Sequence, residues 1–86
     1  MTMLDAEREA QWIRRDEPGK MPVYQRRFSG GYYLARVMDP SGIRRLEKRW
    51  ALYWCGHRIW ELQAMSNRRA AMDQAERWLI EHDVVR

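Results

Sequence analysis

Strand-like segments separated by turn residues fill the middle of the sequence, from residue 23 to residue 64. The segments VYQRRF and YYLARVM are joined by SGG, and DPSG at 39–42 has the Asp, Pro and Gly that a β-turn prefers. A third segment, about 43–55, is followed by Gly56-His57, where glycine permits the positive φ of a hairpin, and by a fourth at 58–64. Because short turns leave successive strands antiparallel, the pattern predicts a meander of three or four strands.

Helical patterns flank these strands. The clearer one, SNRRAAMDQAERWLIEHD, has no interior Gly or Pro and can be capped by Ser66 or Asn67; its apolar stripe consists of Ala71, Met72, Ala75, Trp78 and Leu79. The first segment, TMLDAEREAQWIRRDEPG, has Thr2 as a cap and ends at Pro18-Gly19. We predict a single α+β domain over residues 1–86, in the order α-β-β-β(-β)-α, with the sheet packed against the C-terminal helix.

Composition places the chain among small intracellular proteins. The only cysteine is Cys55, so no disulfide can form within the chain, which suits a reducing cytoplasm. No apolar run approaches the roughly 18–20 residues of a membrane span, and the acidic start is unlike a signal peptide. We therefore expect a cytoplasmic protein that does not enter a membrane.

Positive charge is concentrated in the middle of the chain. Residues 21–60 hold eight basic and two acidic residues, a balance of +6, whereas residues 1–20 and 61–86 each balance to −1. Such asymmetry favours an anionic partner. The basic residues expected to lie near turns and at the start of the last helix are Arg26, Arg27, Arg44, Arg45, Lys48, Arg49, Arg68 and Arg69. The alternative is a set of solvated arginines that reflects a GC-rich genome.

The tryptophans of the third and fourth segments raise the question of which face is covered. With Gly56-His57 as the turn, one face shows Arg49, Ala51, Tyr53 and Cys55 beside Arg58, Trp60, Leu62 and Ala64. We expect the last helix on this face, because Ala51 and Ala64 permit close approach. The other face holds Trp50, Leu52, Trp54 and Ile59. Either the first helix covers that face, or it is exposed and forms a partner or dimer interface.

Catalytic signals are weak. Cys55 and His57 cannot complete a tetrahedral metal site, and SGG lacks the lysine and helix start of a phosphate-binding loop. We predict no catalytic residues, no metal and no cofactor.

The segment YYLARVMDPSGIRR, followed by a strand pair and the helix NRRAAMDQAERWL, resembles the small DNA-binding domains of phage-type tyrosine recombinases over about residues 32–82. Those domains lay a three-stranded sheet, backed by one helix, into the major groove. The helix–three strands–helix order is also similar to double-stranded RNA-binding domains, where a basic pair matching Arg68 and Arg69 grips phosphates. The resemblance implies a free-standing relative of the kind that phages and plasmids encode.

These patterns lead to one functional hypothesis and one rival. We expect a small, basic, non-catalytic protein that binds double-stranded nucleic acid, with DNA favoured over RNA, through an arginine-rich rim of the sheet. The rival is a protein–protein interaction module, either a phage- or plasmid-type inhibitor of a host protein or an obligate homodimer, that uses the Trp50 and Trp54 face.

Overall fold

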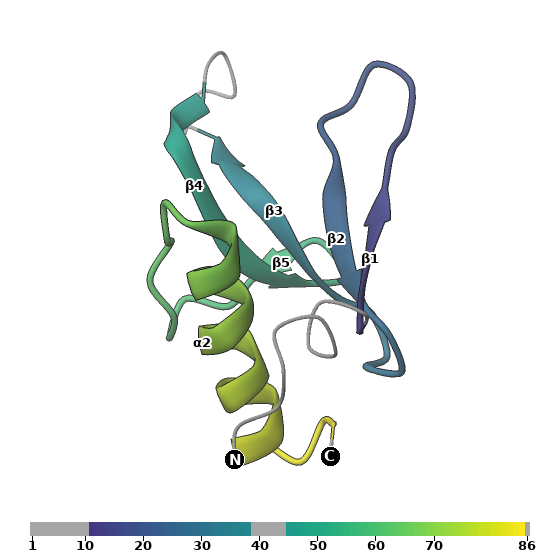
Figure 1. Ribbon diagram of the computed structural model, residues 1–86, viewed down its shortest axis with the longest axis vertical. Helices are drawn as coiled ribbons and strands as arrows, with labels where there is room; N and C mark the ends of the chain where they lie inside the picture. The colour runs from purple at the N-terminus through teal and green to yellow at the C-terminus, as the bar shows by residue number, and fades with distance from the viewer. Residues whose placement is uncertain (1–10, 39–44, 86) are drawn as a thin grey trace.

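In the computed structural model, a five-stranded antiparallel sheet carries one helix on one of its faces (Figure 1). The structure describes residues 11–38 and 45–85, with only the backbone described at 38 and 45–48. The elements are β1 Trp12–Arg15, β2 Val23–Arg26, β3 Tyr32–Met38, β4 Arg45–Trp54, β5 His57–Arg58 and α2 Arg68–Glu81. The strands follow one another across the sheet in chain order, as expected for a meander.

Strand register decides which side chains lie under the helix. Tyr24 lies opposite Leu34, and Leu34 lies opposite Leu52, so these three side chains share one face. Because side chains alternate between faces along a strand, Tyr33 and Tyr53 lie on the other face, where they are also directly opposed. We call the side under α2 the covered face and the opposite side the open face.

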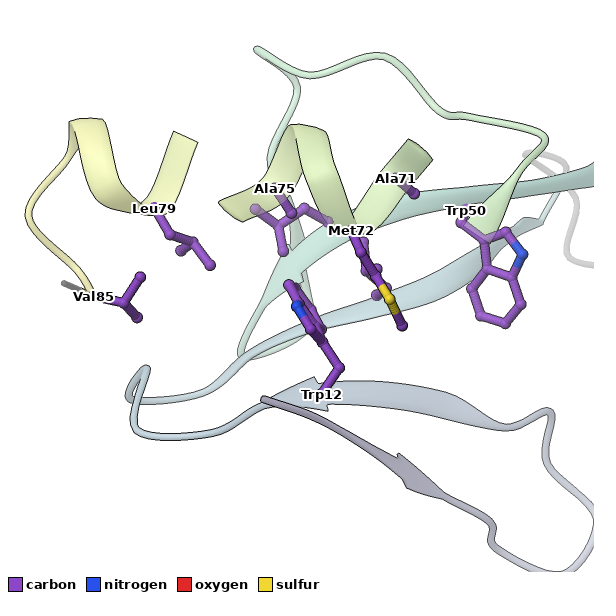
Figure 2. Close-up of a cluster of buried hydrophobic side chains, with 9 residues drawn as sticks. Trp12, Trp50, Ala71, Met72, Ala75, Leu79 and Val85 are labelled. Atoms are coloured by element: carbon purple, nitrogen blue, oxygen red, sulfur yellow. The ribbon is translucent and has the colours of Figure 1, made fainter. Parts of the chain in front are cut away.

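The core lies between α2 and the covered face (Figure 2). From the helix, Met72 points toward the strands, with Trp12 on one side and Trp50 on the other. Leu79, at 0% exposure, is the most deeply buried helical residue, and the small Ala71 and Ala75 are also buried and allow α2 to approach the sheet closely. The helix begins at Asn67, whose side chain accepts hydrogen bonds from the amides of Arg69 and Ala70.

One buried ion pair joins the helix to the first two strands. The carboxylate of Glu76 on α2 accepts from Arg26 Nε and, at 3.3 Å, from Arg26 Nη2. It also accepts from Trp12 Nε1 at 3.1 Å. The side chains of Arg26 and Glu76 are only 7% and 13% exposed, so their opposite charges compensate each other where water gives little screening.

The predicted N-terminal helix is wrong over residues 12–15, which form β1, while residues 1–10 and the cap at Thr2 lie outside the described part of the chain. Trp12 lies opposite Arg26, and Arg15 lies opposite Val23. Residues 12–15, which fit a helical pattern in the sequence, instead form hydrogen bonds with β2. This pairing also buries the side chain of Trp12. Pro18-Gly19, expected as a helix end, lies instead in the turn between two strands.

The last hairpin turns one residue earlier than predicted. Its turn residues are Cys55 and Gly56, with φ of 46° and 87°, the positive pair of a type I′ turn. Trp54 then pairs with His57, whereas the sequence pattern placed Cys55 opposite Arg58. The register differs from the prediction by two residues, so the residues assigned to each face stay the same. The fourth predicted strand shortens to His57–Arg58, followed by an isolated bridge between Trp50 and Met65.

The helix covers the opposite face from the one we predicted. It lies on the Trp50 and Leu52 side and not on the Ala51 side. Large apolar side chains from the sheet meet small ones from the helix, which buries more apolar area than two alanine-lined surfaces could.

Candidate nucleic-acid interface

Arg26, predicted to contact phosphates, is a structural residue. It is 6% exposed and its guanidinium is held by Glu76, so it has no surface from which to reach a polymer. The assignment of Arg26 to the interface is therefore wrong. The charge pattern alone could not reveal this, because the partner carboxylate lies fifty residues further along the chain.

The other predicted basic residues whose side chains are described lie on several elements. Arg27 follows the end of β2, where its guanidinium lies 5.3 Å from the ring centroid of Phe28. Arg68 instead contacts Tyr24, which lies one residue into β2, and Arg69 is exposed in the first turn of α2. Arg49 is exposed on β4; Arg44 lies outside the described residues, and of Arg45 and Lys48 only the strand position is described. The structure thus separates Arg27 from the Arg68–Arg69 pair.

The predicted partner face is mostly core. Trp50 and Leu52 are 7% and 2% exposed beneath α2, and Ile59 packs against the same cluster. Trp54 alone keeps substantial exposure, at 44%, and its indole nitrogen donates to the carbonyl of Gly30. The reading as an exposed interface is therefore wrong for Trp50 and Leu52, whereas Trp54 does lie at the surface.

Two arginines lie on aromatic rings beside the start of α2. The guanidinium of Arg36 lies 5.2 Å from the ring centroid of Trp50, and that of Arg68 lies 4.6 Å from the ring centroid of Tyr24. Tyr24 and Trp50 meet edge to face at 5.5 Å, and Arg68 Nη1 donates to Tyr24 Oη at 2.7 Å. We call Tyr24, Arg36, Trp50 and Arg68 the arginine–aromatic cluster.

The cluster concentrates positive charge. Among the described residues no carboxylate pairs with Arg36, and its Nε is buried without an acceptor. Arg14 lies opposite Tyr24 in the sheet, but it is paired with Asp16, whose hydrogen bond raises the pKa of Arg14 and whose charge offsets that of the guanidinium. The first turn of α2 contains no acidic residue, so the positive end of the helix dipole adds to the same field.

The open face carries a second arrangement of rings and charge. Ile13, Gln25, Tyr33, Tyr53 and Arg58 are opposed in turn across all five strands and form one transverse row. We call this set the tyrosine row. The rings of Tyr33 and Tyr53 stack at 5.5 Å with planes 12° apart. Beyond the row, Arg58 lies 4.2 Å from the ring centroid of Trp60, which is 77% exposed.

Tyr53 titrates in a setting that the row creates. Partial burial raises its pKa, and the nearby positive charge of Arg58 opposes that rise. Tyr53 is therefore a neutral phenol at physiological pH and can donate or accept a hydrogen bond.

Sequence reasoning missed Tyr24, Arg36, Tyr33 and Tyr53 as surface residues. A signal existed for Arg36, because a charged residue in the middle of an apolar strand needs either a partner or an opening. For the tyrosines, alternation shows which residues share a face, but only the register between β3 and β4 sets them directly opposite each other.

Cys55 and His57 are both exposed at the last hairpin, and within residues 11–38 and 45–85 no three His, Cys, Asp or Glu side chains are grouped as metal ligands. In the same ranges no helix has the length and apolar character to cross a membrane.

The fold and surface define a small α+β protein with an arginine-rich, aromatic surface. No protein-family model, curated protein or solved structure matches the chain. The resemblance to recombinase DNA-binding domains and to double-stranded RNA-binding domains therefore stays a prediction.

Proposed function

We propose that this protein is a non-catalytic nucleic-acid-binding protein whose arginine–aromatic cluster holds the phosphate backbone. The observation that carries the proposal is Arg36, a half-buried guanidinium that lies on Trp50 without a carboxylate partner among the described residues. A partly buried charge loses hydration, and among the described residues only the Trp50 ring replaces part of it for Arg36. A bound anion would replace it.

The geometry of the cluster suits phosphate. A guanidinium stacked on a ring has a fixed plane, and its remaining N–H donors point outward in a fork that matches two phosphate oxygens. Arg36 and Arg68 are both held in this way, through Trp50 and Tyr24. Pre-set side chains lose less rotamer freedom when the anion arrives.

Several features favour a polymer over a small free anion. The chain carries a net charge of +4, and Arg49 and Arg69 present further exposed guanidinium groups on β4 and in the first turn of α2. Repeated phosphates can contact such dispersed cations at once, and the release of condensed counterions supplies the affinity. DNA and RNA both present this backbone.

The test is the salt dependence of binding. If about four phosphates are neutralised, the logarithm of the binding constant should fall with the logarithm of the salt concentration at a slope of about −3.6. Arg36→Gln should lower the magnitude of that slope by about one and weaken binding to all sequences alike. Fluorescence anisotropy with a labelled oligonucleotide measures both quantities.

Arg77→Gln is the matched control, because Arg77 is exposed on the same helix as Arg68 but lies more than two turns further along it. It should leave the slope unchanged. No binding at micromolar protein in low salt would refute the proposal, and so would equal slopes for Arg36→Gln and Arg77→Gln. Thermal unfolding of each variant checks that the fold is intact.

A second candidate is a protein-binding or self-associating module that uses the open face. Ile13 and Trp60 are 37% and 77% exposed there, and exposed apolar groups are frequent in interfaces. Light scattering separates the candidates. A dimer that Trp60→Glu dissociates would favour this one.

A further inference from the structure

The tyrosine row and Trp60 form a continuous strip across the open face. Tyr33 stacks on Tyr53, Tyr53 lies opposite Arg58, and Arg58 lies over Trp60. The neighbouring pair toward the start of β4 is Ala35 opposite Ala51, and Ala51 is only 2% exposed, so the face is closed beside the rings at that end. Tyr33, Tyr53 and Trp60 themselves lie outside the core cluster.

The strip is flanked by positive charge. Arg58 belongs to it, Arg15 donates from Nε to Gln25 Oε1 at 3.1 Å, and Arg49 is exposed on the same face of β4 as Tyr53. Among the described residues, no member of the row carries a carboxylate. Asp16 and Glu17 in the β1–β2 turn are bound by Arg14 and Lys20, and Glu61, which follows Trp60, accepts a hydrogen bond from Trp78 Nε1.

A hollow continues the strip at its β1–β2 end. It has a volume of about 620 Å³ and is lined by residues that include Arg15, Asp16, Glu17, Lys20, Val23 and Tyr33. Its ring and aliphatic groups suit a planar heterocycle, while its charged groups are of both signs.

We infer that the open face binds a single strand of nucleic acid, with its bases against Tyr33, Tyr53 and Trp60 and its phosphates near Arg15, Arg49 and Arg58. The inference rests on the proposed function and names the form of nucleic acid. Trp60 is exposed and Tyr33 and Tyr53 are half-buried, and aromatic rings at a surface stack on base faces, which only an unpaired strand presents. A duplex keeps those faces inside its own stack and would offer the rings only its backbone and groove edges.

A second copy of the chain fits the open face less well. Face-to-face pairing would bring Arg15, Arg49 and Arg58 of one molecule against the same positive groups of the other. Like charges in a desolvated contact are strongly unfavourable. An anionic strand complements all three.

The experiment compares an oligothymidylate of roughly 16 nucleotides with its duplex and with an abasic strand of equal length. Each is titrated with the full chain at low salt, and Kd is measured by fluorescence anisotropy. The single strand should bind more tightly than both other probes. Trp60→Ala should weaken single-strand binding by about 5- to 150-fold and leave duplex binding unchanged, because one stacked base contributes about 1–3 kcal/mol.

Phe28→Ala is the matched control. Phe28 is also a largely exposed ring, at 84%, beneath an arginine, but it lies on the β2–β3 turn away from the strip. It should leave all three Kd values unchanged. Trp60 is 77% exposed, so its truncation should leave the protein folded, and circular dichroism of each variant is the check.

The possible failures can be told apart. Equal Kd values for single strand, duplex and abasic strand, with no effect of Trp60→Ala, would overturn this inference while leaving a phosphate-binding protein. Selective loss of binding in Phe28→Ala would also overturn it, because the rings in use would then be at the turn. No binding to any probe would overturn the proposed function as well.

Discussion

The two faces of the sheet carry the same residue types, arginine and tryptophan, in different roles. On the covered face Arg26 meets Glu76 and Trp12 beneath the helix, whereas on the open face Arg58 lies on Trp60 within reach of solvent. Both arrangements place a guanidinium beside an indole. The difference is the carboxylate, which α2 delivers to one face only. An arginine in this protein is structural where the fold supplies its counter-charge, and it is free to act where the fold does not.

The largest expected effect is on the covered face. Arg26→Met keeps most of the side-chain volume but leaves the Glu76 carboxylate buried with Trp12 as its remaining donor. Removing one partner of a buried pair should lower the free energy of unfolding by about 3–5 kcal/mol. Urea denaturation measures the loss. Arg27→Met, at the next position, which is exposed, should change the free energy of unfolding by less than about 0.5 kcal/mol. Similar losses for Arg26→Met and Arg27→Met would contradict the structural role of Arg26.

Adjacent residues on β4 offer a sharper comparison. Leu52, 2% exposed, faces the helix, while Tyr53 is half-buried on the open face. Leu52→Ala should lower the free energy of unfolding by about 2–5 kcal/mol, because it leaves a cavity in the core. Tyr53→Leu should cost only about 0.5–1.5 kcal/mol, the value of a stacked aromatic pair. Thermal unfolding measures both, and a larger loss for Tyr53→Leu would mean that the open face is itself core.

The smallest expected effect is a pH dependence that belongs to the open face. Burial raises the pKa of Tyr53, so the folded state favours the neutral phenol more than the unfolded state does. The stabilisation is complete below about pH 10, the ordinary tyrosine value, and is lost as pH rises through the higher folded pKa. Phenolate absorbance and denaturant midpoints across this range measure it. Tyr53→Phe should remove that part of the alkaline loss; an unchanged alkaline loss in this variant would contradict the assignment.

Local signals predicted the order of the strands after residue 23 and the last helix. The segments SGG, DPSG and Gly56-His57 separate those strands in the sequence, and the 68–81 helix has a clean apolar stripe and an Asn67 cap. The prediction of the first helix failed over residues 12–15 because their conformation is decided by pairing with β2, which no local pattern reveals.

The site was harder to predict because it depends on distant partners. The grouping of residues by face was obtained from alternation alone, but the choice of covered face depends on how the helix fits both surfaces. Arg26 is a structural residue because Glu76 pairs with it, whereas Arg36 has no such carboxylate among the described residues. The net charge of the chain gives no information on either pairing. It predicts attraction to anions without locating the contact.

The chain-order meander has a consequence for how the protein is made. Each strand pairs with the one synthesised just before it, so the sheet can grow by adding short hairpins and needs no distant loop closure. The helix that shelters Trp50 and Leu52 emerges only afterwards. Until this helix docks, the newly formed sheet exposes an apolar surface to chaperones and to neighbouring chains. Aggregation is therefore most favoured during that interval.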